Sequence, residues 1–247
     1  MCENRDFPSL EGDWDRLYLE YPDVYDRFAR TTLPAVAALD ERFDLRNKVL
    51  ADVGSGTGCS TFELARHARF VVGLEPWKPM RDVAIGKVRS YGLRNVAFVD
   101  GIAEALPLRP DSIDAIVSIF GFPFWFVDAG QEGQELAERF VADALGTVKP
   151  GGHILVVGSA PHWGAGELTE VVWPPIDGPD ESDRINTLMT QILGFHYDDV
   201  DVVAEYESVQ EAVATYGFIY GQRAIEYLLA NDISSIKWKL RIHYRTR

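Results

Sequence analysis

The fold is decided by the stretch Ala51-Asp52-Val53-Gly54-Ser55-Gly56-Thr57-Gly58-Cys59. A short apolar run over 49–53 leads into its glycines, and a helical pattern over 61–67 follows them. Glycines between a buried strand and a helix permit a tight turn and close approach of the backbone to a ligand, and the start of the helix leaves free amide groups. The stretch therefore predicts a ligand-binding turn at the carboxyl end of a strand.

Downstream of this loop, short apolar runs alternate with helical stretches. The expected strands cover 70–74, 96–99, 113–119 and 154–158, and the expected helices cover 77–91 and 131–148. Alternation of this kind is typical of a parallel sheet with helices on both faces. The sequence therefore predicts an α/β fold around the loop.

The two ends of the chain have different patterns. Aromatic residues at helical spacing over 18–28 predict a helix that carries Pro22 in its first turn, and Pro34 begins a second helix through Leu39. Towards the C-terminus we expect helices over 183–195, 209–216 and 222–229, and strands over 200–206 and 236–244 that form a final hairpin. We see no linker, so we expect one domain, 1–247, with a helical cap (1–46), a cofactor-binding core (47–160) and C-terminal helices with the final hairpin (161–247).

Charge and composition limit the possible partners. The net charge of -14 disfavours binding to phosphate backbones, so we expect no nucleic-acid partner. No uninterrupted apolar run is long enough to span a membrane. Two cysteines and a charged N-terminus without an apolar core favour a cytoplasmic protein, which we expect to be a monomer or a homodimer.

Three classes of ligand compete for the glycine loop. A phosphate-binding P-loop needs a lysine after its last glycine, and Cys59 stands there instead. A dinucleotide fingerprint needs a third glycine or alanine where this chain has Cys59, and the carboxylate of Asp52 would repel a pyrophosphate. Asp52 would attract an ammonium group, and Glu75, after the next strand, is placed to bind ribose hydroxyls. The pair favours an adenosine ligand with an amino-acid part.

At these residues the chain resembles the class I S-adenosylmethionine-dependent methyltransferases, in particular their small-molecule (type 11-like) group. The resemblance covers about 48–158. Asp52 and the three glycines match the D-x-G-x-G-x-G loop of the family, and Glu75 matches its ribose-binding acid. The stretch 101–108 resembles the G-D-A-E-x-L-P-F segment of the family, and 149–152 resembles its K-P-G-G turn.

The resemblance implies a Rossmann-like, seven-stranded, mostly parallel sheet with one antiparallel strand. It implies S-adenosyl-L-methionine as cofactor and in-line transfer of its methyl group to a small molecule. Ile102 departs from the family, which has an Asp there for the adenine; either Asp100 substitutes, or backbone and apolar contacts hold the ring. The implied cofactor residues are Asp52, Gly54, Ser55, Gly56, Thr57, Gly58, Glu75, Pro76, Trp77, Met80, Gly101, Ile102, Ala103, Glu104 and Ser118.

The acceptor is not identified by any motif. The aromatic residues Phe122, Phe124 and Trp125 follow the strand 113–119 and are candidates for the acceptor pocket, with Tyr25 from the cap; core packing is the alternative for all four. His162 is the candidate base, against the alternative of a solvated loop histidine, and no metal site is expected. An NAD(P)-dependent oxidoreductase and a non-catalytic S-adenosylmethionine-binding protein remain the alternative functions.

Overall fold

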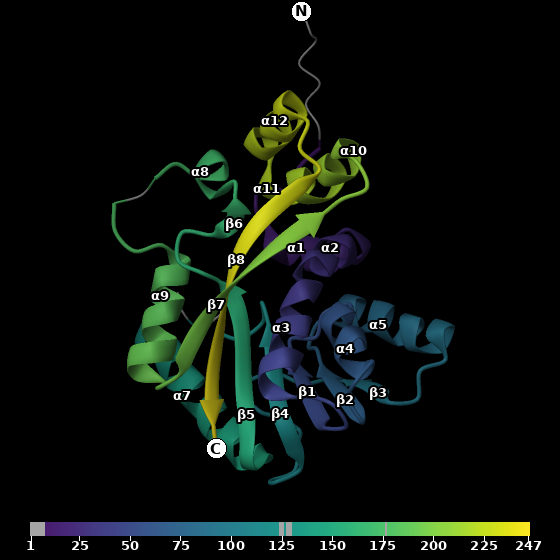
Figure 1. Ribbon diagram of the computed structural model, residues 1–247, viewed down its shortest axis with the longest axis vertical. Helices are drawn as coiled ribbons and strands as arrows, with labels where there is room; N and C mark the ends of the chain where they lie inside the picture. Colours follow the sequence, from purple (N-terminus) through teal and green to yellow (C-terminus); the bar gives the residue numbers. More distant parts are fainter. Residues whose placement is uncertain (1–7, 124–125, 127–129, 176) are drawn as a thin grey trace, which may run out of the picture.

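The computed structural model describes residues 8–123, 126, 130–175 and 177–247, and it contains a seven-stranded sheet in the order β3-β2-β1-β4-β5-β8-β7 (Figure 1). Neighbouring strands are parallel from β3 to β5, and β8 is antiparallel to both β5 and β7. This confirms the predicted Rossmann-like sheet with one antiparallel strand. Its strands are β1 (Val49–Val53), β2 (Phe70–Leu74), β3 (Val96–Val99), β4 (Ile113–Ile119), β5 (Val148–Ser159), β7 (His196–Glu205) and β8 (Ser235–Thr246).

Helices cover both faces of the sheet because its central strands carry apolar side chains on both sides. On β5, Leu155 and Val157 face the cluster that includes α3 (Leu33–Phe43) and α4 (Cys59–Ala65). Ile154 and Val156 face the opposite cluster. The helices of that second cluster are α7 (Gly130–Thr147) and α9 (Glu181–Thr187), while α5 (Lys78–Tyr91) lies beside β3.

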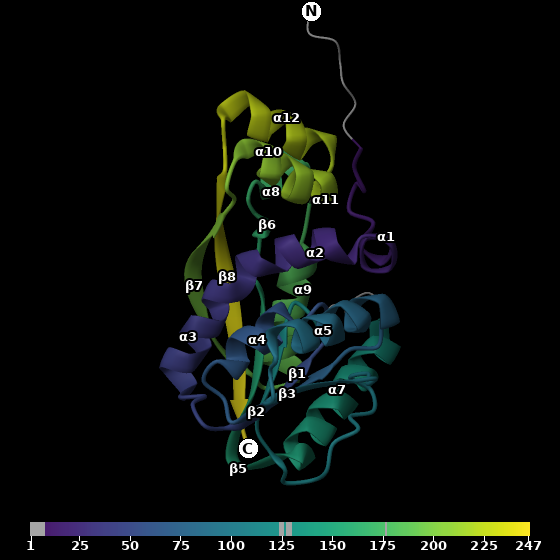
Figure 2. The same ribbon diagram turned by 90° about the vertical axis from the view of Figure 1, so that its right-hand side faces the viewer.

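Over 14–29 the N-terminal cap contains two helices where the sequence predicts one. α1 (Trp14–Glu20) ends at Tyr21, and α2 (Pro22–Ala29) starts at the next residue. Proline fits the first turn of a helix and cannot continue one from before it, so Pro22 separates the two. A 3-10 turn (Arg30–Thr32) then leads into α3. Figures 1 and 2 agree that α1 and α2 lie between the sheet and a group of C-terminal helices.

The predicted final hairpin is confirmed, and it extends past the rest of the sheet. β8 pairs with β7 over its length from Ser235 to Tyr244, but with β5 only from Leu240 onward. The projecting part carries the C-terminal helices and approaches β6 (Gly164–Glu167), which the sequence does not predict (Figure 2). These helices are α8 (Thr169–Val172), α10 (Val209–Ala212), α11 (Phe218–Tyr220) and α12 (Gln222–Asn231).

Two predicted helices change their winding. The helix predicted over 183–195 starts earlier, as α9, and continues as a π-helical turn, Leu188–Ile192. The helix predicted over 209–216 passes from α10 into a second π-helical turn, Val213–Gly217. An apolar pattern does not distinguish these windings because both place the same side chains on one face.

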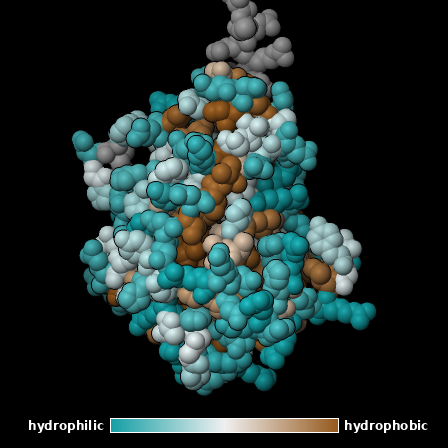
Figure 3. Space-filling view, viewed as in Figure 1, coloured by the Kyte–Doolittle hydropathy of each residue, from teal (hydrophilic) through white to brown (hydrophobic). Residues whose placement is uncertain are grey.

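The surface is mixed in polarity. Figure 3 shows polar side chains around the edges of one face and a band of hydrophobic side chains down its middle, along the line of β7 and β8. Among the described residues, no helix combines the length and the hydropathy needed to cross a membrane.

Candidate functional site

The glycine loop lies between β1 and α4, and its three glycines have left-handed backbone conformations. The φ angles of Gly54, Gly56 and Gly58 are 75°, 55° and 87°. A methyl group on Gly58 would lie 2.7 Å from the ring of Phe62 and 2.8 Å from the ring of Phe98. Any other residue would therefore be strained in this turn. The predicted ligand-binding turn has the required shape.

Asp52, at the end of β1, is a fully buried carboxylate with one unused oxygen. Its Oδ2 accepts hydrogen bonds from the hydroxyls of Ser60 at 2.8 Å and Thr61 at 2.6 Å. Its Oδ1 is buried and has no hydrogen-bond partner among the described residues. Burial raises the pKa of Asp52, and the two hydroxyl bonds counter that effect only in part. An orphaned buried acceptor of this kind suits a bound cationic donor.

Glu75 follows β2 and lies beside the glycine loop. Its Oε2 accepts the backbone N–H of Gly56 at 2.8 Å, and its Oε1 accepts the backbone N–H of Trp77 at 2.8 Å. Burial raises the pKa of Glu75 against these two bonds. A carboxylate oxygen can accept more than one hydrogen bond, so Glu75 holds the loop and still has capacity for two hydroxyls.

The ends of β1 and β4 form the floor of the site. The hydroxyl of Ser118 donates to the carbonyl of Val53 at 2.7 Å and accepts the N–H of Phe122 at 2.8 Å. A methyl group on Gly121 would lie 2.8 Å from both the Ser118 Oγ and the Val53 carbonyl, and one on Gly54 would lie 3.1 Å from the Gly121 Cα. Ser118 therefore fixes the backbone under the loop, and its hydroxyl is used within the protein.

Tyr25 of the cap and Met80 of α5 both pack on the glycine loop. A methyl group on Gly56 would lie 3.1 Å from a ring carbon of Tyr25 and 3.5 Å from the Cε of Met80. The ring of Tyr18 lies between Tyr25 and Trp77, with centroids 5.3 and 6.5 Å away. These residues place aromatic and thioether surface at the predicted cofactor site.

Asp26, which the sequence analysis did not single out, joins the cap to the loop. Its Oδ1 accepts hydrogen bonds from the Thr57 hydroxyl at 2.7 Å and the Cys59 thiol at 2.9 Å. The Lys87 ammonium and the Arg30 guanidinium form ion pairs with the same carboxylate. Burial opposes ionisation, but the bonds from Cys59, Lys87 and Thr57 outweigh it and lower the pKa of Asp26. The sequence did not mark Asp26 as a functional residue, because it is a single acid within a helix identified by its aromatic residues.

The stretch 101–105 forms a turn at the carboxyl end of β3. Gly101 faces Leu74 and Pro107, and Ile102 is 45% exposed and forms a bridge with Ala105. Asp100 forms an ion pair of 3.2 Å with Arg81. Since that carboxylate is engaged, the arrangement favours the second alternative for adenine, backbone and apolar contacts.

A cavity of about 930 Å³ opens between the cap, the carboxyl ends of β4 and β5, and the C-terminal segments. Tyr25, a candidate for the acceptor pocket, lies in its wall together with Tyr18 and Phe120. The prediction that Phe122 lines the acceptor pocket is wrong. Phe122 is buried in the core, with its ring 4.1 Å from that of Phe140, and does not line the cavity. The sequence could not distinguish these two positions for an aromatic residue after a strand. Phe124 and Trp125 lie outside the described residues.

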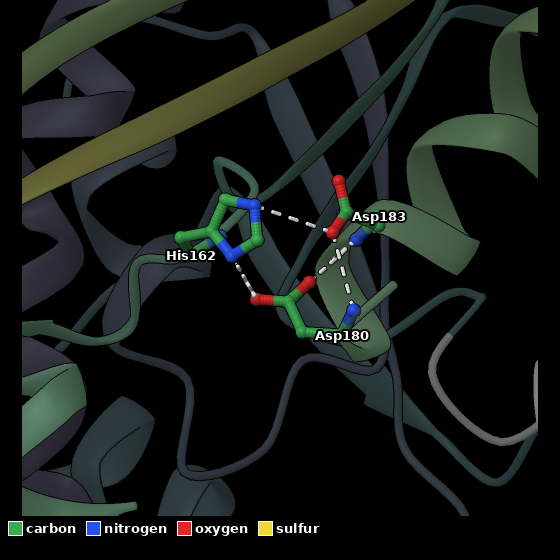
Figure 4. A group of neighbouring side chains, drawn as sticks. All are labelled: His162, Asp180 and Asp183. Atoms are coloured by element: carbon green, nitrogen blue, oxygen red, sulfur yellow. Dashed lines mark hydrogen bonds and ion pairs between the residues drawn. The ribbon is translucent and has the colours of Figure 1, made fainter. Parts of the chain in front are cut away.

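His162 lines this cavity beside two aspartates. Its Nδ1 lies 3.6 Å from Asp180 Oδ2, and its Nε2 lies 3.5 Å from Asp183 Oδ2 (Figure 4). The three groups could offer a cation one ligand atom each, within 4.8 Å of one another. The two aspartates also form the capping box of α9, which accounts for their positions without a metal.

Part of this chain matches known methyltransferases in sequence. Residues 51–156 match a family model described as a methyltransferase domain. An uncharacterised methyltransferase of Geobacillus thermodenitrificans is 33% identical over 119 residues, which are 48% of this chain and 54% of that protein. The chain thus spans about half the length of the curated relatives it matches.

Two solved structures share the fold over most of the chain. One, solved for the conversion of a disulfide bond into a thioacetal group during echinomycin biosynthesis, has a TM-score of 0.61 at 17% identity and covers 87% of this chain and 81% of its own. The other, the cyclase SpnF, has a TM-score of 0.58 at 18% identity and covers 96% of both chains. Residues 51–156 thus match a methyltransferase domain, a domain whose methyl donor is S-adenosyl-L-methionine, and the solved structures share its fold over most of the chain.

The residues present fit that cofactor. The unpaired Oδ1 of Asp52 suits the ammonium of its amino-acid part, and the glycines leave room for its backbone contacts. Glu75 has lone pairs for the ribose hydroxyls, Met80 packs on the loop at Gly56, and the backbone N–H of Trp77 is bonded to Glu75.

Proposed function

We propose that this protein transfers the methyl group of S-adenosylmethionine to a small molecule bound in the cavity beside the glycine loop. The observation that carries the proposal is the buried, unpartnered Oδ1 of Asp52 next to a loop that admits only glycines. A cavity of about 930 Å³ is large enough for an acceptor of drug-like size. Tyr25 packs on the loop and also lines this cavity, so the donor and acceptor sites adjoin.

When bound, S-adenosylmethionine supplies a methyl group on a positively charged sulfur, which is already activated for displacement. The protein then has to position the donor and the acceptor and keep water out. In our proposal Asp52 and Glu75 hold the donor by its two ends. The cap helix α2 covers the loop through Tyr25, and Asp26 holds that helix in place through Thr57.

We propose that His162 accepts the proton when the acceptor must lose one. It lines the cavity, and its two ring nitrogens face Asp180 and Asp183. A carboxylate beside one ring nitrogen orients the imidazole. In methyl-transfer assays, H162N should lower kcat more than KM, because the variant keeps the cavity shape and loses the base. Equal kcat values for H162N and the wild type would remove His162 from this role.

Cofactor and reaction can be tested separately. Calorimetry with S-adenosylhomocysteine, S-adenosylmethionine and NAD⁺ tests the donor site, and we expect binding of the first two only. Tight binding of NAD⁺ with no response to the other two would favour the oxidoreductase alternative. Incubation of the protein with S-adenosylmethionine labelled in its methyl group and a cell extract tests turnover. Because the cyclase SpnF shares this fold, binding alone does not establish methyl transfer; binding without labelled product from any extract would favour a non-catalytic role.

We propose that the whole chain acts as one unit, from the cap to the final hairpin, as a monomer or a homodimer. The cavity wall supports this because it takes residues from the cap, the core and the C-terminal third, including Trp14, Ile119 and Tyr220.

A further inference from the structure

We infer that the acceptor is an amine carried on a bulky aromatic or apolar skeleton. This inference rests on the proposed methyl transfer and specifies its substrate class. It comes from two properties of the cavity wall, its aromatic content and the sign of its charged residues.

Aromatic rings form most of one side of the cavity. The ring of Tyr220 lies 5.9 Å from that of Trp14 and 5.7 Å from that of Trp173, both in edge-on orientation. Phe28 lies 5.9 Å from Trp14 and 6.0 Å from Tyr220. All four line the cavity. Such walls bind flat apolar ligands, and their ring faces also attract cations.

The ionisable residues of the wall have one sign. Glu170, Asp180 and Glu181 line the cavity, and the described part of the wall contains no lysine or arginine. Apart from these three acids, the ionisable side chains in the described part of the wall are His162 and the tyrosines. An acceptor that carries a carboxylate or a phosphate would meet repulsion without a compensating cation, whereas an ammonium would be attracted.

Two tyrosines in the wall report the same negative potential. Burial is the main cause that raises the pKa of Tyr18, and the carboxylates of Glu75, Asp15 and Glu181 raise it further. Burial also raises the pKa of Tyr220, with Tyr206, Tyr18 and Glu181 as additional causes. The contribution of the carboxylates to these shifts favours a cation in the same space, whereas the contribution of burial reflects the exclusion of water from the wall.

This environment also suits the chemistry of an amine. The bound ammonium first gives one proton to His162 or to water. The lone pair of the resulting neutral nitrogen then forms a bond to the methyl carbon while the carbon–sulfur bond breaks, and the electron pair of that broken bond stays on sulfur as a thioether. Positive charge thereby moves from the sulfur to the nitrogen, where nearby carboxylates stabilise it. The product leaves as the methylated ammonium, so one proton is released in each turnover.

The test compares matched ligands that differ only in charge. Tryptamine, indole-3-propionamide and indole-3-propionate share a ring system and chain length, and the same three end groups are placed on phenyl and naphthyl skeletons. Each is titrated into the protein saturated with S-adenosylhomocysteine. We expect at least one amine to bind about fivefold or more tighter than its amide, with its carboxylate weakest, and to accept label from methyl-labelled donor.

Charge-neutral variants locate the source of the preference. E170Q/E181Q should reduce the preference for the amine over the amide to about twofold or less, since both glutamates are exposed and each contributes modestly through solvent. E135Q/E138Q removes the same two charges from α7, outside the cavity, and should leave the preference unchanged. If both double variants lower it equally, the effect is one of net charge and the inference is wrong.

The outcomes separate this inference from the proposed function. Failure of S-adenosylhomocysteine to bind would overturn the proposed function itself. Normal cofactor binding with carboxylates or amides preferred, or with no amine bound on any of the skeletons, would overturn the amine inference and leave methyl transfer standing.

Discussion

The carboxylate of Asp26 on α2 accepts a hydrogen bond from the hydroxyl of Thr57 in the glycine loop, over 2.7 Å. Asp26 is 5% exposed and lies 31 positions before Thr57 in the chain. The contact therefore connects the N-terminal cap directly to the loop that belongs to the cofactor-binding core. The stability of the cap and the affinity for the cofactor should depend on each other.

We expect D26N to lower both the stability and the affinity for S-adenosylhomocysteine. The change leaves Lys87 buried beside a neutral group, and breaking a buried ion pair costs about 3 kcal/mol. D26N/K87Q should recover part of that loss. The control D23N removes a charge from the same helix at a side chain that is 77% exposed, and should change little. Chemical unfolding and calorimetry measure the two quantities; an unchanged affinity in a folded D26N protein would separate the cap from the loop.

Asp52 should show opposite effects on stability and on binding. Because its pKa is raised by burial, its charge destabilises the cofactor-free protein at neutral pH. D52N should therefore raise the melting temperature without cofactor. The same change should weaken S-adenosylmethionine about 10- to 100-fold, since hydrogen bonds to a charged group contribute about 1.5–3 kcal/mol. A variant that melts lower and binds normally would contradict both statements.

The affinity for the cofactor should fall in mildly acidic solution. The pKa values of Asp52 and Glu75 are raised above their ordinary values of 3.8 and 4.5, so both groups take up protons at a higher pH than exposed carboxylates. Protonation removes the acceptor for the ammonium but relieves the burial of charge. Binding of the cofactor therefore strengthens as pH rises through the raised pKa values. Over the same range the free energy of unfolding of the cofactor-free protein falls, because the buried carboxyl groups become charged. When the pH is lowered from neutral, calorimetry should show the affinity beginning to fall while the pH is still above 4.5. A fall that begins only below pH 4.5 would mean that both carboxyl groups titrate normally.

Two glycines should respond to alanine in opposite directions. G121A places a methyl group 2.8 Å from the Val53 carbonyl and should cost about 1–3 kcal/mol, with loss of cofactor binding as β1 and β4 separate. G86A places it in open space within α5 and should stabilise the protein by about 1 kcal/mol. Thermal unfolding of the pair tests whether the close approach under the loop is real.

Cys59 should resist alkylation in the folded protein. Burial, followed by the neighbouring carboxylate of Asp26, raises the pKa of its thiol to about 12, and a thiol reacts as its thiolate. Iodoacetamide at neutral pH should therefore modify Cys59 only after unfolding, and peptide mass spectrometry distinguishes it from Cys2. Rapid modification in the native protein would show that the loop opens to solvent.

The core of the fold could be predicted because it depends on local patterns. The strands from 49–53 to 113–119 agree with β1 to β4, since each is a short apolar run between turn residues. Asp52 and Glu75 could be singled out because they stand at the ends of such runs. The division of the cap at Tyr21 was missed because an aromatic stripe continues across Pro22.

The acceptor side could not be predicted to the same extent, because its wall comes from distant parts of the chain. Trp14, Trp173 and Tyr220 meet only in the folded protein, and no local pattern marks them as neighbours. Phe122 was placed in the pocket because an aromatic residue after a strand can turn either to a ligand or to the core. Here Phe140 and Phe126 provide the packing that holds it in the core.

The final hairpin has a consequence for how this chain can change. The segment 206–234 leaves the sheet at the end of β7 and returns at the start of β8, and it places Tyr220 in the cavity wall. Exchange of that segment would leave the pairing of β8 with β5 in register and would not touch the glycine loop. Selection for a new acceptor can therefore act on one replaceable module, which reaches the donor site only through the contacts of Tyr220 with the cap.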